Sequence, residues 1–341
     1  VSTEYLAHLN PTANIVAVDI SAGTLAVAQE RIRHSCPPGD RSIEFRHLSL
    51  YDLDQIEGEF DAINCVGVLH HMPEPIGGIK ALASKLAPGG ILHIFVYAAI
   101  GRWEISLMQE AIALLQSQNP DASIKQGVKL GRDIFATLPA SNRLVQREKT
   151  RWQLENNRDE CFADMYVHPQ EIDYTIDTLF ELIEASDLEF VGFSNPQTWQ
   201  PERLLGNNPE LLALAQALPA RQQYRLIELL DTDIAHYEFF LSRPPLPKPD
   251  WSIDRNILNV IPQRHPCIDG WESGCLFDPD YQIVKLSELE LQFMHTCNGD
   301  ATVAEILSDR SEINLDLVRS LLKRRLILLP ARSRTNTQTH N

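Results

Sequence analysis

The sequence predicts an α/β protein built on an open, mostly parallel sheet, and three observations in the first hundred residues support this fold class. A short apolar run at 15–18 is followed by helical apolar spacing that begins at Ser21. Residues 60–66 have the composition of another strand. The stretch 91–98 is almost entirely apolar, which is typical of a strand buried on both faces. Strands that alternate with helices at this spacing indicate βαβ units and parallel pairing.

Further elements follow the same criteria along the chain. A helix from 21 is expected to end at the Pro-Pro-Gly of 37–39, and the apolar pair at 43 and 45 indicates the next strand. The remaining expected elements are a helix at 79–83 ended by a turn at 88–90, helices through 103–178, a helix at 176–185, a strand at 188–193, a helical stretch at 209–230 and a strand at 236–242.

The chain is expected to divide into two domains with a tail. We expect a first domain over 1–243 with helical insertions at about 101–170 and 196–235, and a proline-rich linker over 244–251. A small α+β domain over 252–330 follows, in which Ser287 and Glu290 form a capping-box pattern. Its three short helices and β element resemble a winged-helix module, and the tail 331–341 is expected to be disordered.

Composition excludes several classes of protein. The 341 residues carry 30 Lys and Arg against 46 Asp and Glu, a net charge of −16 that disfavours non-specific binding to nucleic acid. The longest apolar run is too short to span a bilayer, and no secretory leader opens the chain. Six cysteines without a CxxC pair do not indicate a disulfide scaffold, so we expect a cytoplasmic protein that does not bind membranes.

Asp19 stands between a strand and a helix, where an open α/β sheet presents residues to a nucleotide. A carboxylate at this position can accept hydrogen bonds from both hydroxyls of a ribose. The alternative is an acid at a helix start that interacts favourably with the helix dipole.

Three later segments, together with Asp19, resemble the class I S-adenosylmethionine-dependent methyltransferases, which have a Rossmann-like sheet. They are Ser49-Leu50-Tyr51-Asp52, residues 60–72 (FDAINCVGVLHHM) and the L-x-P-G-G turn at 86–90. The resemblance covers residues 1–100 and returns over 171–243, where a helix and two strands resemble the closing antiparallel hairpin of the family. It implies that S-adenosylmethionine is the cofactor.

The resemblance also implies individual roles. Asp19 would bind the ribose diol, and Ile20 would lie against the adenine ring. Five residues at later strand ends would contact the rest of the cofactor, with the first two at the adenine edge and the others beside the methionine moiety: Ser49, Leu50, Asn64, Cys65 and Val66.

One family feature is missing from the sequence. The family begins with a strand and a glycine-rich loop of the E/D-x-G-x-G-x-G kind, whereas residues 1–7 read like the helix that follows that loop. A valine at position 1 fits a GTG codon read literally, so we expect a misplaced gene start or a fragment. The open sheet edge that results would be exposed to unwanted pairing.

Candidate residues for acceptor binding lie past the strand ends and in the first insertion. His70 and Tyr97 are the expected catalytic residues, because both lie just past strand carboxyl ends. The expected substrate-binding residues are His71, Arg102, Trp103, Tyr166 and His168. The alternative for each is a packed or capping residue. Because His70 and His71 are adjacent, we expect them to point in different directions and not to share a metal.

Methyl transfer to a small molecule or a protein side chain is therefore the predicted function. A non-catalytic scaffold that keeps the fold, or a nicotinamide dehydrogenase, which also uses an acid after its second strand, remains an alternative. Cysteines and histidines between 265 and 297 match no standard zinc spacing, so no metal site is predicted. Because the basic run at 323–325 suits a solvated helix end, a protein partner is expected for the C-terminal domain in preference to DNA.

Overall fold

The computed structural model describes residues 2–35, 42–119, 122–246, 249–279, 281–310 and 312–330. The predicted helix stop at 37–39, part of the linker and the tail 331–341 lie outside the described residues. The chain divides into two compact units, Val1–Leu246 and Pro247–Asn341.

The first unit contains an α/β sheet that is divided into two pieces. Strands β1 (Ile15–Asp19) and β2 (Ile43–His47) pair in parallel. The second piece has the order β3-β4-β6-β5, in which β3 (Phe60–Val66) and β4 (Leu86–Tyr97) are parallel. Strand β6 (His236–Ser242) runs antiparallel to β4 and to β5 (Glu189–Phe193). The predicted fold class, including the closing antiparallel strand, is confirmed.

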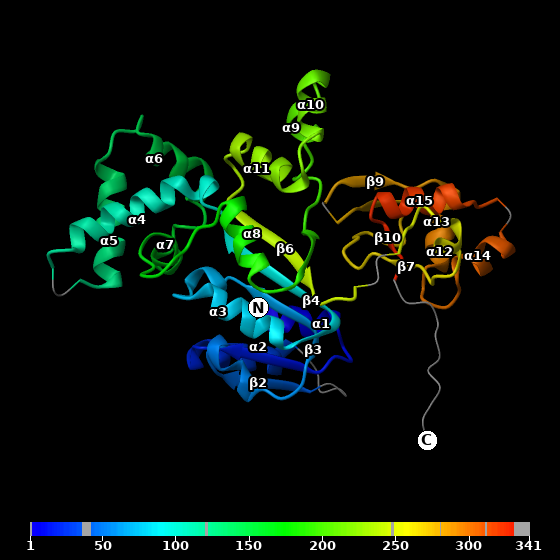
Figure 1. Cartoon of the computed structure of the whole chain (residues 1–341), viewed down its shortest axis with the longest axis horizontal. Coiled ribbons are helices and arrows are strands. Elements are labelled where there is room, and N and C mark those ends of the chain that lie inside the picture. Colours follow the sequence, from blue (N-terminus) through cyan, green and yellow to red (C-terminus); the bar gives the residue numbers. More distant parts are fainter. Residues whose placement is uncertain are drawn as a thin grey trace. The chain divides into compact units, whose positions relative to one another are not determined.

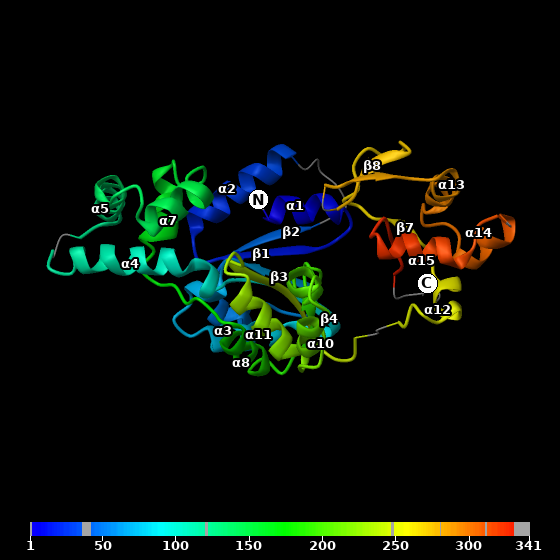
Figure 2. The same ribbon diagram turned by 90° about the horizontal axis from the view of Figure 1, so that it is seen from above.

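Helices pack on both faces of this sheet. Helices α1 (Ser2–Leu9) and α2 (Ala22–Ser35) lie on one side, as Figure 2 shows. Helices α3 (Pro75–Ser84), α8 (Ile176–Glu184) and α11 (Ala220–Leu230) lie on the other side (Figures 1 and 2).

Alternation along β4 explains how the sheet is buried. Leu92, Ile94 and Val96 are fully buried and join the core on the side of α3, α8 and α11. His93 and Tyr97, on the opposite face, are half-buried. One face of β4 is therefore committed to the core, and the other carries the polar and aromatic groups that enter the candidate site.

The predicted L-x-P-G-G turn differs in detail from the structure. Strand β4 already begins at Leu86, which pairs with Phe60, and the register then shifts so that Ile91 pairs with Ala62. Gly89 has a φ of +75° within this irregularity and donates its N–H to the carbonyl of Arg243 at 2.7 Å. The Pro-Gly-Gly segment is thus a bulge inside a long strand, because its backbone groups still find partners on the neighbouring segment.

The first insertion forms a helical subdomain with its own core. Its elements are η3 (Ile100–Arg102), α4 (Trp103–Gln116), α5 (Ile124–Thr137), α6 (Arg143–Arg147), the π-helical turn η4 (Glu148–Trp152) and α7 (Asp159–Tyr166). Ile105, Met108 and Phe162 lie at the centre of that core.

The second insertion contains α9 (Glu202–Leu205), α10 (Pro209–Gln216) and α11. The helical stretch predicted over 209–230 is thus two helices. The break falls at Pro219, which is extended with a ψ of 148° and begins α11 as its N-cap.

The second unit combines short helices with two-stranded antiparallel pairs. Its elements are α12 (Asp254–Leu258), β7 (Gln263–Arg264), β8 (Cys275–Phe277), β9 (Ile283–Lys285), α13 (Glu288–Thr296), α14 (Val303–Asp309), α15 (Leu315–Lys323) and β10 (Ile327–Leu328). Strand β7 pairs with β10, and β8 with β9. The predicted Ser287–Glu290 capping box is present at the start of α13. The resemblance to a winged helix stays a prediction.

Candidate functional site

Asp19 ends β1 at the carboxyl edge of the sheet, as predicted. Its Oδ1 accepts a hydrogen bond from the backbone N–H of Ser21 at 2.7 Å, and Ser21 Oγ in turn accepts from Thr24 N at 3.2 Å. Asp19 is half-buried, and the neighbouring Ile20 is 76% exposed. The carboxylate thus stabilises the start of α2, which is the structural role considered above, and it stands beside an exposed apolar side chain.

The loops after β1 and β2 lie side by side. Leu48 donates its N–H to the carbonyl of Asp19 at 3.1 Å, and His47 Nε2 lies 2.9 Å from the carbonyl oxygen of Ile20. Ser49 caps the 3-10 helix η1 (Leu50–Gln55) by accepting from Tyr51 N at 3.3 Å. Asp19 and Ile20 are therefore brought next to the segment that contains Ser49 and Leu50.

The end of β3 places its three predicted residues in different surroundings. Asn64 is exposed, and its Oδ1 lies 2.6 Å from His93 Nδ1. Val66 is 40% exposed, whereas Cys65 lies in the core. Burial raises the pKa of the Cys65 thiol to about 12. Alternation along the strand turns the Cys65 side chain into the core, to the opposite face from Asn64 and Val66, so a cofactor contact predicted for Cys65 could involve its backbone but not its thiol.

His70 and Tyr97 meet at the carboxyl ends of β3 and β4. Their ring centroids are 4.0 Å apart, and the Cζ of Arg102 lies over the Tyr97 ring at 3.5 Å from its centroid. His71 lies 4.2 Å from His70 and 4.0 Å from His168, measured between ring centroids. The expectation that the side chains of His70 and His71 point in different directions is wrong, because their rings lie in contact, although both residues belong to the 3-10 turn η2 (Leu69–His71), which separates consecutive positions by about 120°.

The surroundings of His70 and Tyr97 keep these two rings neutral. His70 is fully buried, and desolvation, together with His71, Arg102 and His168, lowers its pKa to about 3. Desolvation also raises the pKa of Tyr97, while Arg102 acts in the opposite direction. Neither ring is therefore charged near neutral pH.

Arg102 is the centre of a buried polar group that we name the Arg102 cluster. Its members are Arg102, Ser106, Gln109, Glu171 and Asp173. Arg102 Nη2 lies 2.6 Å from Glu171 Oε1, and Arg102 Nε lies 3.4 Å from Asp173 Oδ1. Ser106 donates to Asp173 at 3.0 Å, and Gln109 donates to Glu171 at 3.1 Å.

The segment 168–174 crosses the carboxyl ends of β3 and β4, and it contains Glu171 and Asp173, the two carboxylates of the Arg102 cluster. Ile172 donates its N–H to the carbonyl of His70 at 2.8 Å, and Tyr174 donates to the carbonyl of Tyr97 at 2.9 Å. His71 Nδ1 lies 3.0 Å from the carbonyl oxygen of Gln170. Sequence reasoning missed Glu171 and Asp173. The alternation of acids around Ile172 was an available signal, since it places both carboxylates on the same side of an extended segment.

Two predicted acceptor residues lie elsewhere. Tyr166 is fully buried in the core of the insertion, where its hydroxyl donates to Glu148. Trp103 begins α4, and the guanidinium of Arg143 lies over its ring at 5.1 Å. Neither has a contact with the His70–Tyr97 pair among the described interactions, so the packing role suits Tyr166 better than the predicted substrate contact.

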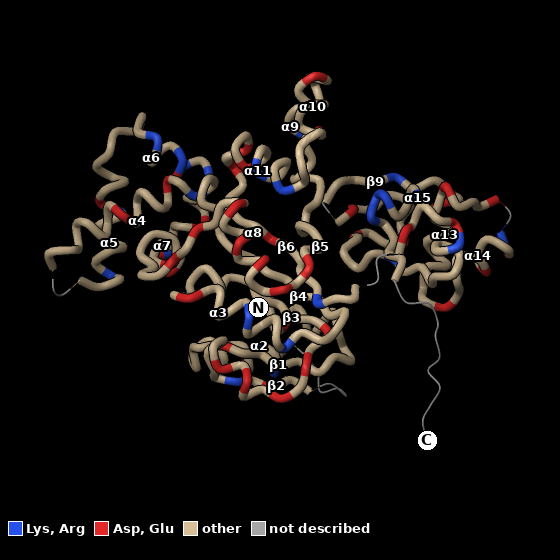
Figure 3. The backbone as a smooth tube through the Cα atoms, viewed as in Figure 1, with Lys and Arg blue, Asp and Glu red and all other residues tan. Residues whose placement is uncertain are grey.

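The predicted gap in the sheet has a structural counterpart. In the described part of the chain, β1 pairs with β2 alone and β3 pairs with β4 alone, so each has one edge without a strand. Figures 2 and 3 show β1 and β3 as neighbours within the first unit. Asp19 and Val66 thus end strands on either side of this opening.

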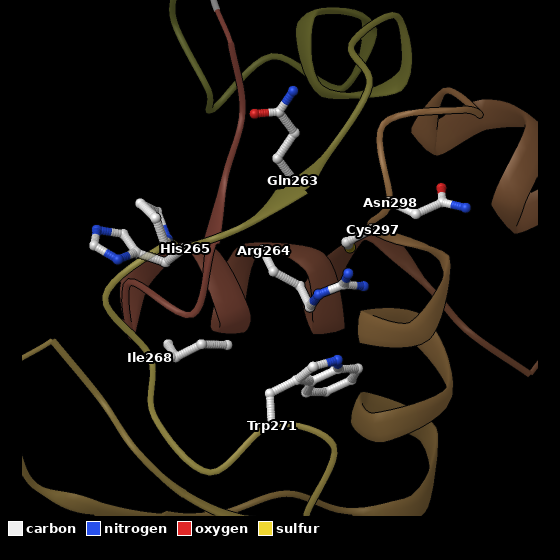
Figure 4. Close-up of a pocket in the computed structure, with 8 residues that line it drawn as sticks. Gln263, Arg264, His265, Ile268, Trp271, Cys297 and Asn298 are labelled. Atoms are coloured by element: carbon white, nitrogen blue, oxygen red, sulfur yellow. The ribbon is translucent and has the colours of Figure 1, made fainter. Parts of the chain in front are cut away.

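The second unit has a separate surface pocket of about 380 Å³. Figure 4 shows Arg264 next to Trp271 in it, and the guanidinium lies 4.9 Å from the ring centroid. The Cys297 thiol is buried and donates to the carbonyl of Phe293 at 3.4 Å. No group of His, Cys, Asp and Glu suited to a metal ion occurs among the described residues.

Comparison with known proteins agrees with the fold. A family model described as a methyltransferase domain matches residues 1–92. The structure of PKMT2 from Rickettsia typhi in complex with AdoHcy superposes with a TM-score of 0.61 at 14% identity, over 95% of this chain and 68% of that one. The first unit therefore has the fold of the class I S-adenosylmethionine-dependent methyltransferases.

The chain belongs to the same family as an uncharacterized protein from Synechococcus sp. (strain ATCC 27144). The two are 58% identical over 333 residues, which cover 96% of this chain and 79% of the relative. The ubiquinone biosynthesis O-methyltransferase of Dechloromonas aromatica is 37% identical over 99 residues, which cover 26% of this chain and 41% of that enzyme.

Proposed function

We propose that the protein transfers a methyl group from S-adenosylmethionine to an acceptor that is a small molecule or a protein side chain. The observation that supports this most strongly is the position of Asp19 and the 76% exposed Ile20 beside the loop 48–50 at the carboxyl edge of the sheet. A carboxylate for the ribose hydroxyls and an apolar surface for the adenine are the groups that a nucleoside requires at this edge.

The bound cofactor would supply an activated methyl group on a sulfonium. The chain then has to orient the acceptor and keep water away, which are positioning and desolvation tasks. His70 and Tyr97 are buried, neutral and adjacent at the strand ends, so they are suited to form a dry wall beside the acceptor. The exposed Asn64 and Val66 at the end of β3 are suited to border the methionine moiety.

Calorimetric titration with S-adenosylhomocysteine tests the proposal. We expect binding by the wild-type chain and a loss of about 10- to 100-fold in affinity for Asp19→Asn, since hydrogen bonds to a charged group contribute roughly 1.5–3 kcal/mol. The asparagine still offers an oxygen to Ser21 N, so the start of α2 is retained. Asp54→Asn, at an exposed position of η1, is the matched control and should bind like the wild type.

A non-catalytic scaffold is the second candidate function. The open edges of β1 and β3 favour it, because they interrupt the sheet between two of the strand ends on which the proposed cofactor site depends. A folded, monodisperse chain that gives no heat with S-adenosylhomocysteine at millimolar concentration would support this candidate. A protein partner of the second unit is proposed in either case.

No described helix has both the length and the apolar composition needed to cross a membrane.

Acidic positions are spread along both units in Figure 3. In the basic run at the end of α15, Arg324 is paired with Glu290. The proposed acceptor is therefore not a nucleic acid.

A further inference from the structure

The Arg102 cluster contains more negative than positive charge. Two carboxylates face one guanidinium, and all three side chains are nearly removed from solvent, with 3% exposure for Arg102, 5% for Glu171 and 12% for Asp173. Arg102 and one carboxylate together have no net charge. The second carboxylate therefore leaves one negative charge without a partner among these contacts. An uncompensated buried charge is costly, and this surplus favours a further cation.

Two carboxylate oxygens of the same cluster lack a hydrogen-bond donor, and Arg102 Nε, a buried donor, lacks an acceptor within hydrogen-bond geometry. Glu171 Oε1 accepts from Arg102 and Gln109, and Asp173 Oδ2 accepts from Ser106. The other oxygens of these carboxylates, Glu171 Oε2 and Asp173 Oδ1, are buried and accept no hydrogen bond in the described structure, although Asp173 Oδ1 faces Arg102 Nε at 3.4 Å. Buried acceptors of this kind are normally satisfied, so donors are expected at this place.

His70 adds a second, independent observation. It is fully buried, and neither of its ring nitrogens has a hydrogen-bond partner in the described structure. Its ring packs against the ring of Tyr97, and the guanidinium of Arg102 lies over that same ring. The unsatisfied imidazole and the unsatisfied carboxylates therefore flank the same aromatic ring at the end of β4.

We propose that the Arg102 cluster, with His70 and Tyr97, binds the primary ammonium group of the methyl acceptor. An ammonium group brings one positive charge against the surplus carboxylate, and three N–H donors that can reach the two unsatisfied carboxylate oxygens. The face of an aromatic ring such as Tyr97 also attracts a cation. This inference rests on the proposed function, because methyl transfer is what gives a bound amine a reaction.

The reaction on such an acceptor balances without a further reagent. The ammonium nitrogen first loses a proton to solvent, and a neighbouring carboxylate of the cluster can relay it. The nitrogen lone pair then forms the new C–N bond to the methyl carbon while the C–S bond breaks. The electron pair of that bond stays on sulfur, which becomes a neutral thioether, and the positive charge ends on the methylated nitrogen.

Binding of n-butylammonium, followed through the ring signals of the histidines by NMR in the absence of cofactor, tests the inference separately from the proposed function. We expect the His70 signals to shift on titration with n-butylammonium and to stay in place with 1-butanol, which has a similar shape and no charge. Equal responses to the two ligands, or no response to n-butylammonium, would overturn the inference.

Charge-neutral variants locate the site. Glu171→Gln and Asp173→Asn each leave Arg102 with one carboxylate, so a neutral ion pair remains and the fold is expected to persist. Both should weaken n-butylammonium binding at least tenfold. Glu110→Gln removes an exposed acid from α4, the helix that contributes Ser106 and Gln109 to the cluster, and is the matched control. Unchanged affinity in both cluster variants would refute the assignment.

Methyl transfer from radiolabelled S-adenosylmethionine then identifies the source of the amine. One arm offers small primary amines, and the other offers a lysine-containing peptide. Transfer to either supports the inference, and exclusive transfer to hydroxyl or carboxyl compounds contradicts it. If S-adenosylhomocysteine does not bind by calorimetry while n-butylammonium still does, the proposed function fails and the ammonium site stands.

Discussion

The imidazole of His70 lies on the phenol ring of Tyr97, with ring centroids 4.0 Å apart, although His70 follows β3 and Tyr97 is the last residue of β4. The contact depends on the parallel pairing of β3 and β4, which brings both carboxyl ends to the same edge of the sheet. The segment 168–174 fixes it from outside, because Ile172 and Tyr174 donate backbone hydrogen bonds to His70 and Tyr97 respectively. One catalytic candidate from each strand end is thus held in a single buried cluster.

The burial of His70 makes stability depend on pH. Desolvation, with contributions from His71, Arg102 and His168, lowers its pKa to about 3, against about 6.5 in an unfolded chain. Between these values the unfolded chain binds a proton that the folded chain does not. The neutral His70 ring therefore makes its full contribution to the free energy of unfolding above pH 6.5. This contribution decreases as the pH falls towards 3, and it is about 1–2 kcal/mol smaller at pH 5.

Urea unfolding at pH 7 and pH 5 measures this contribution. The His70→Leu variant has no titrating group at this position. Between pH 7 and pH 5 its free energy of unfolding should therefore fall by about 1–2 kcal/mol less than that of the wild type. His34→Gln removes a histidine whose side chain is 70% exposed, and it should behave like the wild type. Identical pH dependence in all three proteins would show that His70 is accessible to protons in the folded state.

Much of the sheet, and the position of Asp19 at its carboxyl edge, could be predicted from sequence. Alternating strand and helix patterns locate β1, β3 and β4, and Asp19 follows because the last residue of a parallel strand reaches the carboxyl edge. Such positions depend on local periodicity and on strand ends, and both are visible in a single sequence.

The cluster around His70, Tyr97 and Arg102 could be predicted only in part. His70, Tyr97 and Arg102 stand at or just after strand ends, whereas their partners Glu171 and Asp173 are separated from Arg102 by an insertion of about seventy residues. No periodic pattern links these positions, because the backbone of 168–174 brings them together by hydrogen bonds to His70 and Tyr97. For Tyr166 the sequence left a substrate contact and a packed position as alternatives, since the core of the insertion forms between separate helices and no local pattern distinguishes them.

Gly101 directly precedes Arg102 in η3. We predict that any side chain at this position displaces the backbone that leads into the Arg102 cluster. A Cβ built on Gly101 would lie 1.8 Å from the carbonyl oxygen of Ile234, which is backbone and cannot rotate away. We expect Gly101→Ala to lower the free energy of unfolding by about 2 kcal/mol or more, as overpacking does in buried sites.

Gly23 supplies the matched comparison for this substitution. A Cβ there would meet Ser21 Oγ at 3.7 Å, an ordinary contact, within helix α2. Gly23→Ala should therefore raise the free energy of unfolding by about 0.5 kcal/mol. Denaturant unfolding of both variants measures the contrast. Similar free energies for the two variants would mean that the segment around Ile234 moves freely.

Glu228 is predicted to be a structural acid of the first unit. It is 1% exposed, and it accepts from the hydroxyl of Tyr237, from Arg225 and, at 3.1 Å, from the N–H of Ile176 at the start of α8. Glu228→Ala would leave a buried hydroxyl and a helix-start N–H unpaired. We expect a loss of about 3 kcal/mol in the free energy of unfolding.

Glu181→Ala controls for the removal of an acid on a neighbouring helix. Glu181 is exposed on α8, and its replacement should change the free energy of unfolding by less than about 0.5 kcal/mol. Thermal or urea unfolding followed by circular dichroism measures both variants. A Glu228→Ala protein as stable as the Glu181→Ala protein would mean that water satisfies the vacated partners.

The open edge of β3 is predicted to be visible in hydrogen exchange. Strand β6 pairs with β4 on one side and β5 on the other, whereas β3 pairs with β4 alone among the described strands. Amides of β3 that point away from β4 therefore have no strand carbonyl to bond, and they should exchange at rates typical of exposed backbone. Mass spectrometry of peptides that cover 60–66 and 236–242 should show about half of the β3 amides exchanging within seconds, while those of β6 stay protected at least a hundredfold longer. Equal protection of the two strands would mean that a further strand covers this edge, and it would remove the reason for considering a scaffold as the second candidate function.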